Sequence, residues 1–209
     1  MRCGWLLCLA LSCAPLVAAA QQVLPALYDV TGVAAGDVLN IRAKPDASAE
    51  IVGRLPRNAK SIEVVATDAT GKWAIVNTAE QSGFVALRFL VPQDGPDWGA
   101  LTQPLTCFGT EPFWSLGLDP ATGAASLSDP ETPERPAMIR TLWPNTPSHS
   151  AAALVFDGAG FDGFAALRGE SCSDGMSDRQ YGIGVSLFMR DAAAAASPAM
   201  HGCCTLNRR

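Results

Sequence analysis

Four cysteines in the second half of the chain are the residues whose chemistry is easiest to define. The chain has seven cysteines; three lie within the first 13 residues, and the others are Cys107, Cys172, Cys203 and Cys204. An even number of cysteines is typical of disulfide bonds in chains that leave the cytoplasm. Buried free thiols are the alternative. A metal site is disfavoured because the chain has no Cys-x-x-Cys motif and only two histidines, His149 and His201. We expect two disulfides, no metal ion and no cofactor.

Cys203 and Cys204 are neighbours, which restricts how they can pair. Adjacent residues on a strand point to opposite faces, so each is expected to reach a different partner. A disulfide between the two would close a strained ring. Four cysteines allow three connectivities, and these residues alone do not choose among them.

The segment Gly109-Thr110-Glu111-Pro112-Phe113-Trp114 combines a carboxylate with two aromatic rings. A residue before proline favours extended backbone, so a strand here places Phe113 and Trp114 on opposite faces. One ring then packs inside and the other is offered to a sugar or a peptide, or both rings cover a small core. Glu111 and Trp114 are the ligand-binding candidates. A catalytic role for Glu111 is disfavoured because no second carboxylate accompanies it at a readable position.

Asp174, Asp178 and Arg179 follow Cys172 in a segment rich in turn residues. Asp174-Gly175 is a turn signal, so we expect a capped loop that a disulfide anchors and that Asp178 and Arg179 orient through hydrogen bonds. A ligand site at these side chains is the alternative. A calcium ion shared by Asp174 and Asp178 is disfavoured because the ligand spacing of an EF-hand is absent.

Residues 1–20 have the pattern of a secretory signal. Arg2 supplies the positive charge, an apolar run follows, and Ala18-Ala19-Ala20 has the small-x-small pattern before a cut at Gln21. A lipoprotein signal with Cys13 as the lipidated residue is the alternative. No later segment is apolar enough to span a bilayer. We therefore expect a periplasmic or secreted protein without a transmembrane segment.

The charge balance excludes some classes of partner. The formal net charge is −5, and loss of residues 1–20 removes only the positive charge of Arg2. An acidic chain lacks the basic field that nucleic acids and anionic lipids attract. We expect no nucleic-acid partner.

The elements that must position these residues are strands. Residues 21–92 alternate short β-prone runs with turns, as in Val38–Arg42, Ser61–Thr67 and Lys72–Thr78, which predicts a small barrel. Residues 93–104 are polar and turn-rich, and we expect a linker in which Trp98 packs on either half or between them.

Residues 105–209 contain a further series of strand candidates, and the chain as a whole is predicted to be all-β. We expect a disulfide-stabilised antiparallel barrel or roll in this half. The five alanines after Asp191 could form one helical turn. The strand candidates are 106–108, 113–118, 125–128, 138–143, 152–156, 165–169, 184–189 and 201–206.

The first half carries motifs that resemble the bacterial SH3 (SH3b) domain. They are Leu39-Asn40-Ile41-Arg42 with Pro45, then Lys72-Trp73, then Gly83-Phe84-Val85 with Phe89-Leu90. The resemblance implies a small SH3-like barrel with a groove that Arg42, Trp73 and Phe84 frame. The favoured alternative for Trp73 is a place in the core. Lys44 stands where a small residue is common in such domains, and Phe84 stands where tryptophan is usual.

The second half carries three boxes that resemble an uncharacterised family of bacterial envelope proteins. They are Gly109-Thr110-Glu111-Pro112-Phe113-Trp114, Cys172-Ser173-Asp174-Gly175-Met176-Ser177-Asp178 and Gly202-Cys203. The resemblance implies an envelope location and no particular activity. The second and third boxes recur together in such proteins, which implies the pairs Cys172–Cys203 and Cys107–Cys204.

These features lead to one hypothesis of function and two alternatives. The hypothesis is a non-catalytic exported envelope protein whose SH3b module is an adaptor for peptidoglycan or an envelope protein. The alternatives are an inhibitor or small-ligand carrier in the periplasm and an accessory part of a cell-wall hydrolase. An enzyme is disfavoured, because a cysteine peptidase needs a free cysteine beside a histidine and a zinc amidase needs more metal ligands.

Overall fold

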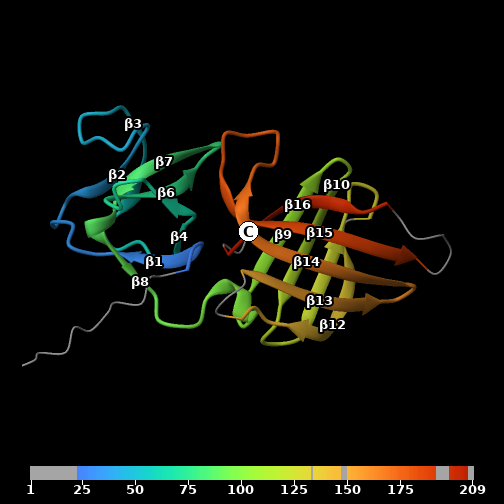
Figure 1. The fold of residues 1–209 in the computed structure, drawn as a ribbon. Coiled ribbons are helices and arrows are strands. Elements are labelled where there is room, and N and C mark those ends of the chain that lie inside the picture. The colour runs from blue at the N-terminus through green and yellow to red at the C-terminus, as the bar shows by residue number, and fades with distance from the viewer. Residues whose placement is uncertain (1–22, 133, 147–149, 192–197, 207–209) are drawn as a thin grey trace, which may run out of the picture.

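The computed structural model of the protein describes residues 23–132, 134–146, 150–191 and 198–206. Two β-sheet units follow one another along the chain, and short 3-10 turns are the only helical elements in these ranges (Figure 1). The all-β prediction is confirmed. The predicted signal, His149 and the alanine run after Asp191 lie outside the described residues.

The N-terminal unit, residues 23–92, consists of two antiparallel sheets around one core. One sheet has the order β4-β1-β8 and the other the order β3-β2-β7-β6-β5. The predicted strand at 61–67 breaks at Val65, so that its two parts join different sheets. The elements are β1 (Ala26–Val30), β2 (Val38–Arg42), β3 (Ile51–Pro56), β4 (Ile62–Val64), β5 (Ala66–Thr67), β6 (Trp73–Thr78), β7 (Gln81–Ala86), the 3-10 turn η1 (Leu87–Phe89) and β8 (Leu90–Pro92).

The core of this unit follows from the alternation of side chains along its strands. Along β6, Ala74 and Val76 are buried, whereas Trp73 and Ile75 are half-buried on the other face. A period of two residues places every second side chain on the same face of a strand. The buried cluster contains Ala26, Tyr28, Val30, Leu39, Ile41, Val64, Ala74, Val76, Val85 and Leu90.

The second unit, the C-terminal barrel, closes in the strand order β10-β11-β12-β13-β14-β15-β16-β9. Each of the eight predicted strand segments overlaps one of these strands, and closure selects a barrel over a roll. A closed barrel leaves no unpaired strand edge. The strands are β9 (Leu105–Thr110), β10 (Phe113–Asp119), β11 (Ala124–Ser128), β12 (Arg135–Trp143), β13 (Ala151–Gly158), β14 (Phe161–Cys172), β15 (Tyr181–Asp191) and β16 (Met200–Thr205).

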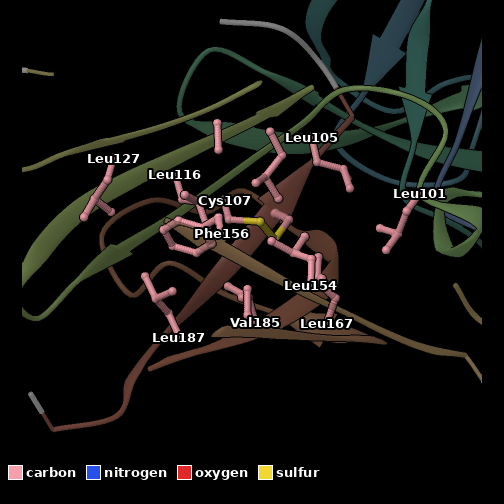
Figure 2. Packing of buried hydrophobic residues seen from close by; sticks show 14 of the residues in the cluster. Leu101, Leu105, Cys107, Leu116, Leu127, Leu154, Phe156, Leu167, Val185 and Leu187 are labelled. Carbon is pink, nitrogen blue, oxygen red and sulfur yellow. A yellow bond between two sulfur atoms is a disulfide. The ribbon is translucent and has the colours of Figure 1, made fainter. Parts of the chain in front are cut away.

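Side chains fill the middle of the C-terminal barrel. Figure 2 shows a disulfide at Cys107 surrounded by aliphatic side chains and by Phe156. Leu116, Leu154 and Leu187 are fully buried in this cluster. An eight-stranded barrel is just wide enough for such filling, so the middle of the barrel is a packed core.

The segment expected to be a linker contributes to this core. It contains the 3-10 turn η2 (Trp98–Ala100), and Trp98 and Leu101 are fully buried in the cluster of the C-terminal barrel. Asp97 caps the turn by accepting a hydrogen bond from the Gly99 amide at 2.9 Å, and it accepts another from Asn145 at 2.9 Å. Trp98 therefore belongs to the C-terminal barrel. Within the expected linker, residues 93–104, only residues 94–96 form a continuous exposed stretch.

A buried carboxylate joins the two units. Glu63 on β4 accepts hydrogen bonds from the Thr205 hydroxyl and from the Leu206 amide at the end of β16. Leu27 on β1 also packs against the core of the C-terminal barrel. In the described part of the chain, no helix is long and apolar enough to cross a membrane.

Candidate functional site

A groove of about 350 Å³ lies on the N-terminal unit, between the loop that precedes β2, strand β2, the start of β6 and the turn η1. Apolar and charged side chains share its lining. The residues that give it chemical character are Val33, Asp37, Arg42, Trp73, Arg88 and Phe89. A site of this size matches small-molecule and peptide pockets, which usually combine an apolar surface with a few polar groups.

Trp73 faces the groove because of the strand alternation in β6. Its neighbour Ala74 is fully buried, so the indole lies on the opposite face and is half-buried. The expectation that Trp73 belongs to the core is not what the structure shows. Trp73 instead lines the groove.

Two arginines make the groove cationic. Arg42 is half-buried, and its Nη1 donates a hydrogen bond to the Ala49 carbonyl at 2.7 Å. Arg88 is exposed, and its guanidinium carbon lies 4.6 Å from the centroid of the Phe89 ring. Asp37 is the one carboxylate among the lining residues. None of the ion pairs between described residues involves Arg42 or Arg88.

Phe84 does not line the groove. It lies opposite Arg42 and Ile75 in the two ladders of β7, and the aromatic position in the groove belongs to Phe89. Arg88 and Phe89 were missed as site residues. A signal was available, because Phe89 belongs to the Phe89-Leu90 part of the same motif, and the turn η1 that carries both residues follows β7.

Both expected disulfides are present. Cys107 pairs with Cys204 inside the barrel, and Cys172 pairs with Cys203 on its outer side. The outer disulfide belongs to a small cluster with Phe108 and Tyr181, whose rings meet edge to face at 5.0 Å between centroids. This cluster anchors the loop of residues 173–180, between β14 and β15.

Asp174 organises the inside of that loop. Its carboxylate accepts hydrogen bonds from the amides of Met176 and Ser177 and from the hydroxyls of Ser177 and Tyr181. Burial by itself would raise the pKa of Asp174, but the hydrogen bonds led by the Ser177 amide outweigh it and lower the pKa. Asp174 is therefore a capping residue, as expected.

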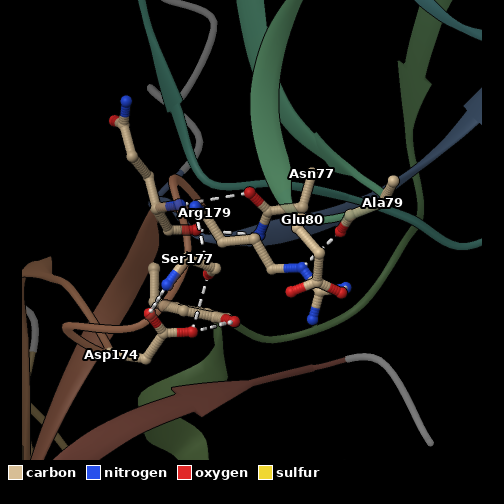
Figure 3. Close-up of polar contacts among 8 residues, drawn as sticks. Asn77, Ala79, Glu80, Asp174, Ser177 and Arg179 are labelled. Carbon is tan, nitrogen blue, oxygen red and sulfur yellow. Dashed lines mark hydrogen bonds and ion pairs between the residues drawn. The ribbon is translucent and has the colours of Figure 1, made fainter.

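Arg179 joins the loop to the N-terminal unit (Figure 3). Its Nε donates to the Ala79 carbonyl at 2.5 Å, and its Nη2 lies 3.0 Å from the Glu80 carboxylate. The backbone of Asp178 bonds to the same hairpin, through Glu80 and Ser82, while the Asp178 side chain is exposed. The Arg179 side chain and the Asp178 backbone therefore orient the loop.

The Glu-Pro-Phe-Trp segment separates its rings as its strand pattern predicted. Phe113 is 52% exposed and Trp114 is 5% exposed. Trp114 packs over Gly109 and Gly202, where a Cβ atom would collide with its ring or with the backbone. The three boxes thus meet in space, since Thr110 also bonds to the Asp174 carbonyl at 3.0 Å. Glu111 is exposed and lines none of the cavities formed by these residues.

The described residues contain no group of three His, Cys, Asp or Glu side chains that could hold a metal ion. No family model, curated protein or solved structure matches this chain. The residues of the groove are therefore the basis of the function proposed below.

Proposed function

We propose that the protein is a non-catalytic exported envelope protein, periplasmic or secreted, whose N-terminal unit is an SH3b-type adaptor. Its groove binds cell-wall peptides that present a carboxylate beside an apolar side chain. The observation that carries the proposal is the pairing of two guanidinium groups with the Trp73 and Phe89 rings in one groove.

The chemistry of the groove supports this class of ligand. A guanidinium group binds a carboxylate with two parallel hydrogen bonds, and it keeps its charge at any physiological pH. The hydrogen bond from Arg42 to the Ala49 carbonyl holds its side chain in place before a ligand arrives. The aromatic rings offer contact area to the alkyl part of a peptide. Among the described lining residues two guanidinium groups stand against one carboxylate, Asp37. Asp46 outside the lining also interacts with the charge of Arg42, so Arg88 supplies most of the attraction for an anionic ligand.

The cell envelope is consistent with the rest of the chain. Two disulfides fit an oxidising compartment. Peptidoglycan lies in that compartment, and its peptides carry free carboxylates. The net charge of −5 opposes non-specific attraction to anionic polymers, so binding must depend on the groove itself.

The test is sedimentation of the purified protein with isolated peptidoglycan. We expect Trp73→Ala and Arg88→Glu each to weaken binding by about tenfold or more, because central aromatic and arginine contacts dominate such interfaces. Trp143→Ala and Arg168→Glu are the matched controls, since both residues are exposed on the C-terminal barrel. Binding should also fall with salt, because the ion pair with the ligand is partly screened.

The circular dichroism spectrum and melting temperature of each variant separate loss of binding from loss of folding. Arg88 is exposed, so its substitution leaves the core intact. The proposal is wrong if folded wild-type protein does not sediment with peptidoglycan, or if the groove variants and the control variants bind equally.

A further inference from the structure

The C-terminal barrel has a cavity of about 520 Å³ at the end where β10 and β12 begin and β11 and β15 end. It is separate from the groove of the N-terminal unit. Trp114, Leu127, Met189 and Met200 give it an apolar wall, and Phe113 lies at its rim. Barrel mouths with an apolar lining and a few polar groups are common ligand sites.

The cavity has a closed floor. Leu127 and Met189 are buried members of the core that fills the barrel, so the hollow ends where the packed layer begins. Trp114 can lie against one wall because Gly109 and Gly202 have no side chains there. The mouth is therefore a shallow apolar cup with one aromatic wall, large enough for part of a small molecule.

Charged groups surround the cup, and they are mostly acidic. Arg135 and Asp191 form an ion pair of 2.6 Å across the rim, and the Arg135 guanidinium lies 3.9 Å from the Phe161 ring centroid. Asp129 and Glu131 also line the cavity. Asp129 accepts hydrogen bonds from the amides of Glu131 and Thr132, which hold its loop. Among the described lining residues, three carboxylates against one guanidinium leave two negative charges at the mouth.

We propose that this mouth is a binding site for a small amphiphile with an apolar body and a cationic head, such as an alkylammonium. The apolar body occupies the cup against Trp114, Leu127 and Met189, where burial of its surface drives binding. The cationic head lies at the rim near Glu131 and Asp129 and above the Phe113 ring, where opposite charge and the ring face both attract it. An anionic head would meet two unbalanced negative charges.

The test is calorimetric titration of the mature protein with decylammonium, decanoate and ethylammonium, each below its aggregation concentration. We expect decylammonium to bind and ethylammonium to give no signal. The affinity for decanoate should be lower than that for decylammonium by a factor of about ten or more. The comparison with decanoate isolates the head group, and the comparison with ethylammonium isolates the apolar body.

Two variants place the site at the mouth, each with a matched control. Met200→Trp fills the cup and should weaken decylammonium binding by about tenfold or more, whereas Met138→Trp on the outer face of β12 should not. Glu131→Lys reverses a rim charge and should weaken binding by about tenfold, whereas Glu50→Lys on the N-terminal unit should not. Glu131 is exposed, so this variant is not expected to disturb folding.

Several outcomes would overturn the proposal. The proposal of a binding site is wrong if the wild type shows no binding of decylammonium up to about 1 mM, because the dissociation constant would then exceed that concentration. The place is wrong if the folded Met200→Trp and Glu131→Lys proteins bind like their controls. The ligand class is wrong if decanoate binds as tightly as decylammonium.

Discussion

Glu63 is a carboxylate that the fold takes out of water. It is 4% exposed and lies on β4 of the N-terminal unit, in contact with the end of β16. Burial raises the pKa of Glu63, and the hydrogen bonds from Thr205 and Leu206 oppose only part of that effect. The interface between the two units therefore holds a group whose charged form is disfavoured.

This burial predicts a pH dependence of stability. Because the pKa is raised in the folded state, the contribution of Glu63 is fully present below the ordinary value of 4.5 and is lost as the pH rises through the folded-state pKa. Glu63→Gln cannot ionise and keeps hydrogen-bonding groups toward Thr205. We expect its free energy of unfolding to decline less than that of the wild type from pH 4.5 to about 8 in urea titrations.

The exposed Glu50→Gln serves as the control and should follow the wild-type curve. Equal pH profiles for the wild type and Glu63→Gln would show that the carboxylate is not disfavoured at this interface.

The pKa of Asp174 is shifted in the opposite direction from that of Glu63, downward. Asp174 is only partly shielded from water, and three hydrogen-bond donors of the 173–180 loop together with the Tyr181 hydroxyl favour its charged form. Its lowered pKa means that its contribution to the loop is present above the ordinary aspartate value and is lost as the pH falls through the lower, folded-state value. For each carboxylate, the number of hydrogen-bond donors compared with the extent of burial decides whether its pKa is lowered or raised.

At the scale of elements, β16 holds the C-terminal barrel together from both faces. Cys204 points into the core toward β9, and Cys203 points outward toward the end of β14. Neighbouring strand residues can do this only because their side chains alternate. The last strand is thus joined covalently to β9, its partner in the barrel, and to the end of β14, directly before the loop that carries Asp174.

The two disulfides should differ in their contribution to stability. They span 97 and 31 residues, and closing the longer loop restricts the unfolded chain by about 1 kcal/mol more in the chain-entropy model. We expect the pair Cys107→Ala and Cys204→Ala to lower the free energy of unfolding by more than the pair Cys172→Ala and Cys203→Ala, since it also removes two fully buried sulfur atoms.

Urea unfolding of both double variants measures the difference. A larger loss for the Cys172 and Cys203 pair would mean that the outer disulfide, and not the core disulfide, carries the greater stabilisation.

The turn η2 connects the two units by inserting its tryptophan into the second. Trp98 is fully buried, and its Nε1 has no hydrogen-bond partner among the described residues. We expect Trp98→Ala to reduce the free energy of unfolding by about 3–5 kcal/mol. Trp98→Phe should cost much less, because a ring remains and the unpaired N–H is removed.

Equilibrium unfolding of the full chain, read by circular dichroism, tests this prediction. A change within about 1 kcal/mol for Trp98→Ala would place the residue outside the cooperative core.

At the scale of the whole molecule, each unit has its own core, and polar contacts together with the apolar contact of Leu27 join them. The buried cluster of the N-terminal unit comes entirely from residues 26–90. The polar contacts across the boundary include those of Glu63 with the end of β16 and those of the 173–180 loop with the β6–β7 hairpin, the second of which Figure 3 shows. Leu27 adds an apolar contact with the barrel core. Such an interface orients two units without supplying the core of either one.

A fragment of residues 21–92 should therefore fold alone, with a β-type spectrum and a cooperative melt. In the fragment Glu63 would meet water, so its burial cost disappears together with its hydrogen bonds. Limited proteolysis of the full chain should cut within residues 94–96, because Trp98 and Gly99 are buried. An unfolded fragment, or first cuts elsewhere between the units, would contradict this division.

Much of the local structure could be predicted from the amino-acid sequence alone. Strand positions could be predicted because a half-buried strand repeats every two residues, as in β2 and β6, and turns could be placed by Asp, Gly and Pro. The opposite faces of Phe113 and Trp114 followed from the same period. The disulfide pairs followed from the resemblance of the boxes around Cys172 and Cys203.

Which residues from distant segments share a site depends on how the whole chain folds. Alternation says that Trp73 and Ala74 face opposite ways, but it does not say which face is covered, so Trp73 was expected in the core. The groove takes Phe89 and not Phe84, the mouth brings Trp114 beside Met200, and Trp98 leaves the expected linker for the barrel core. These outcomes depend on sheet closure and on contacts between remote segments, which no local period encodes.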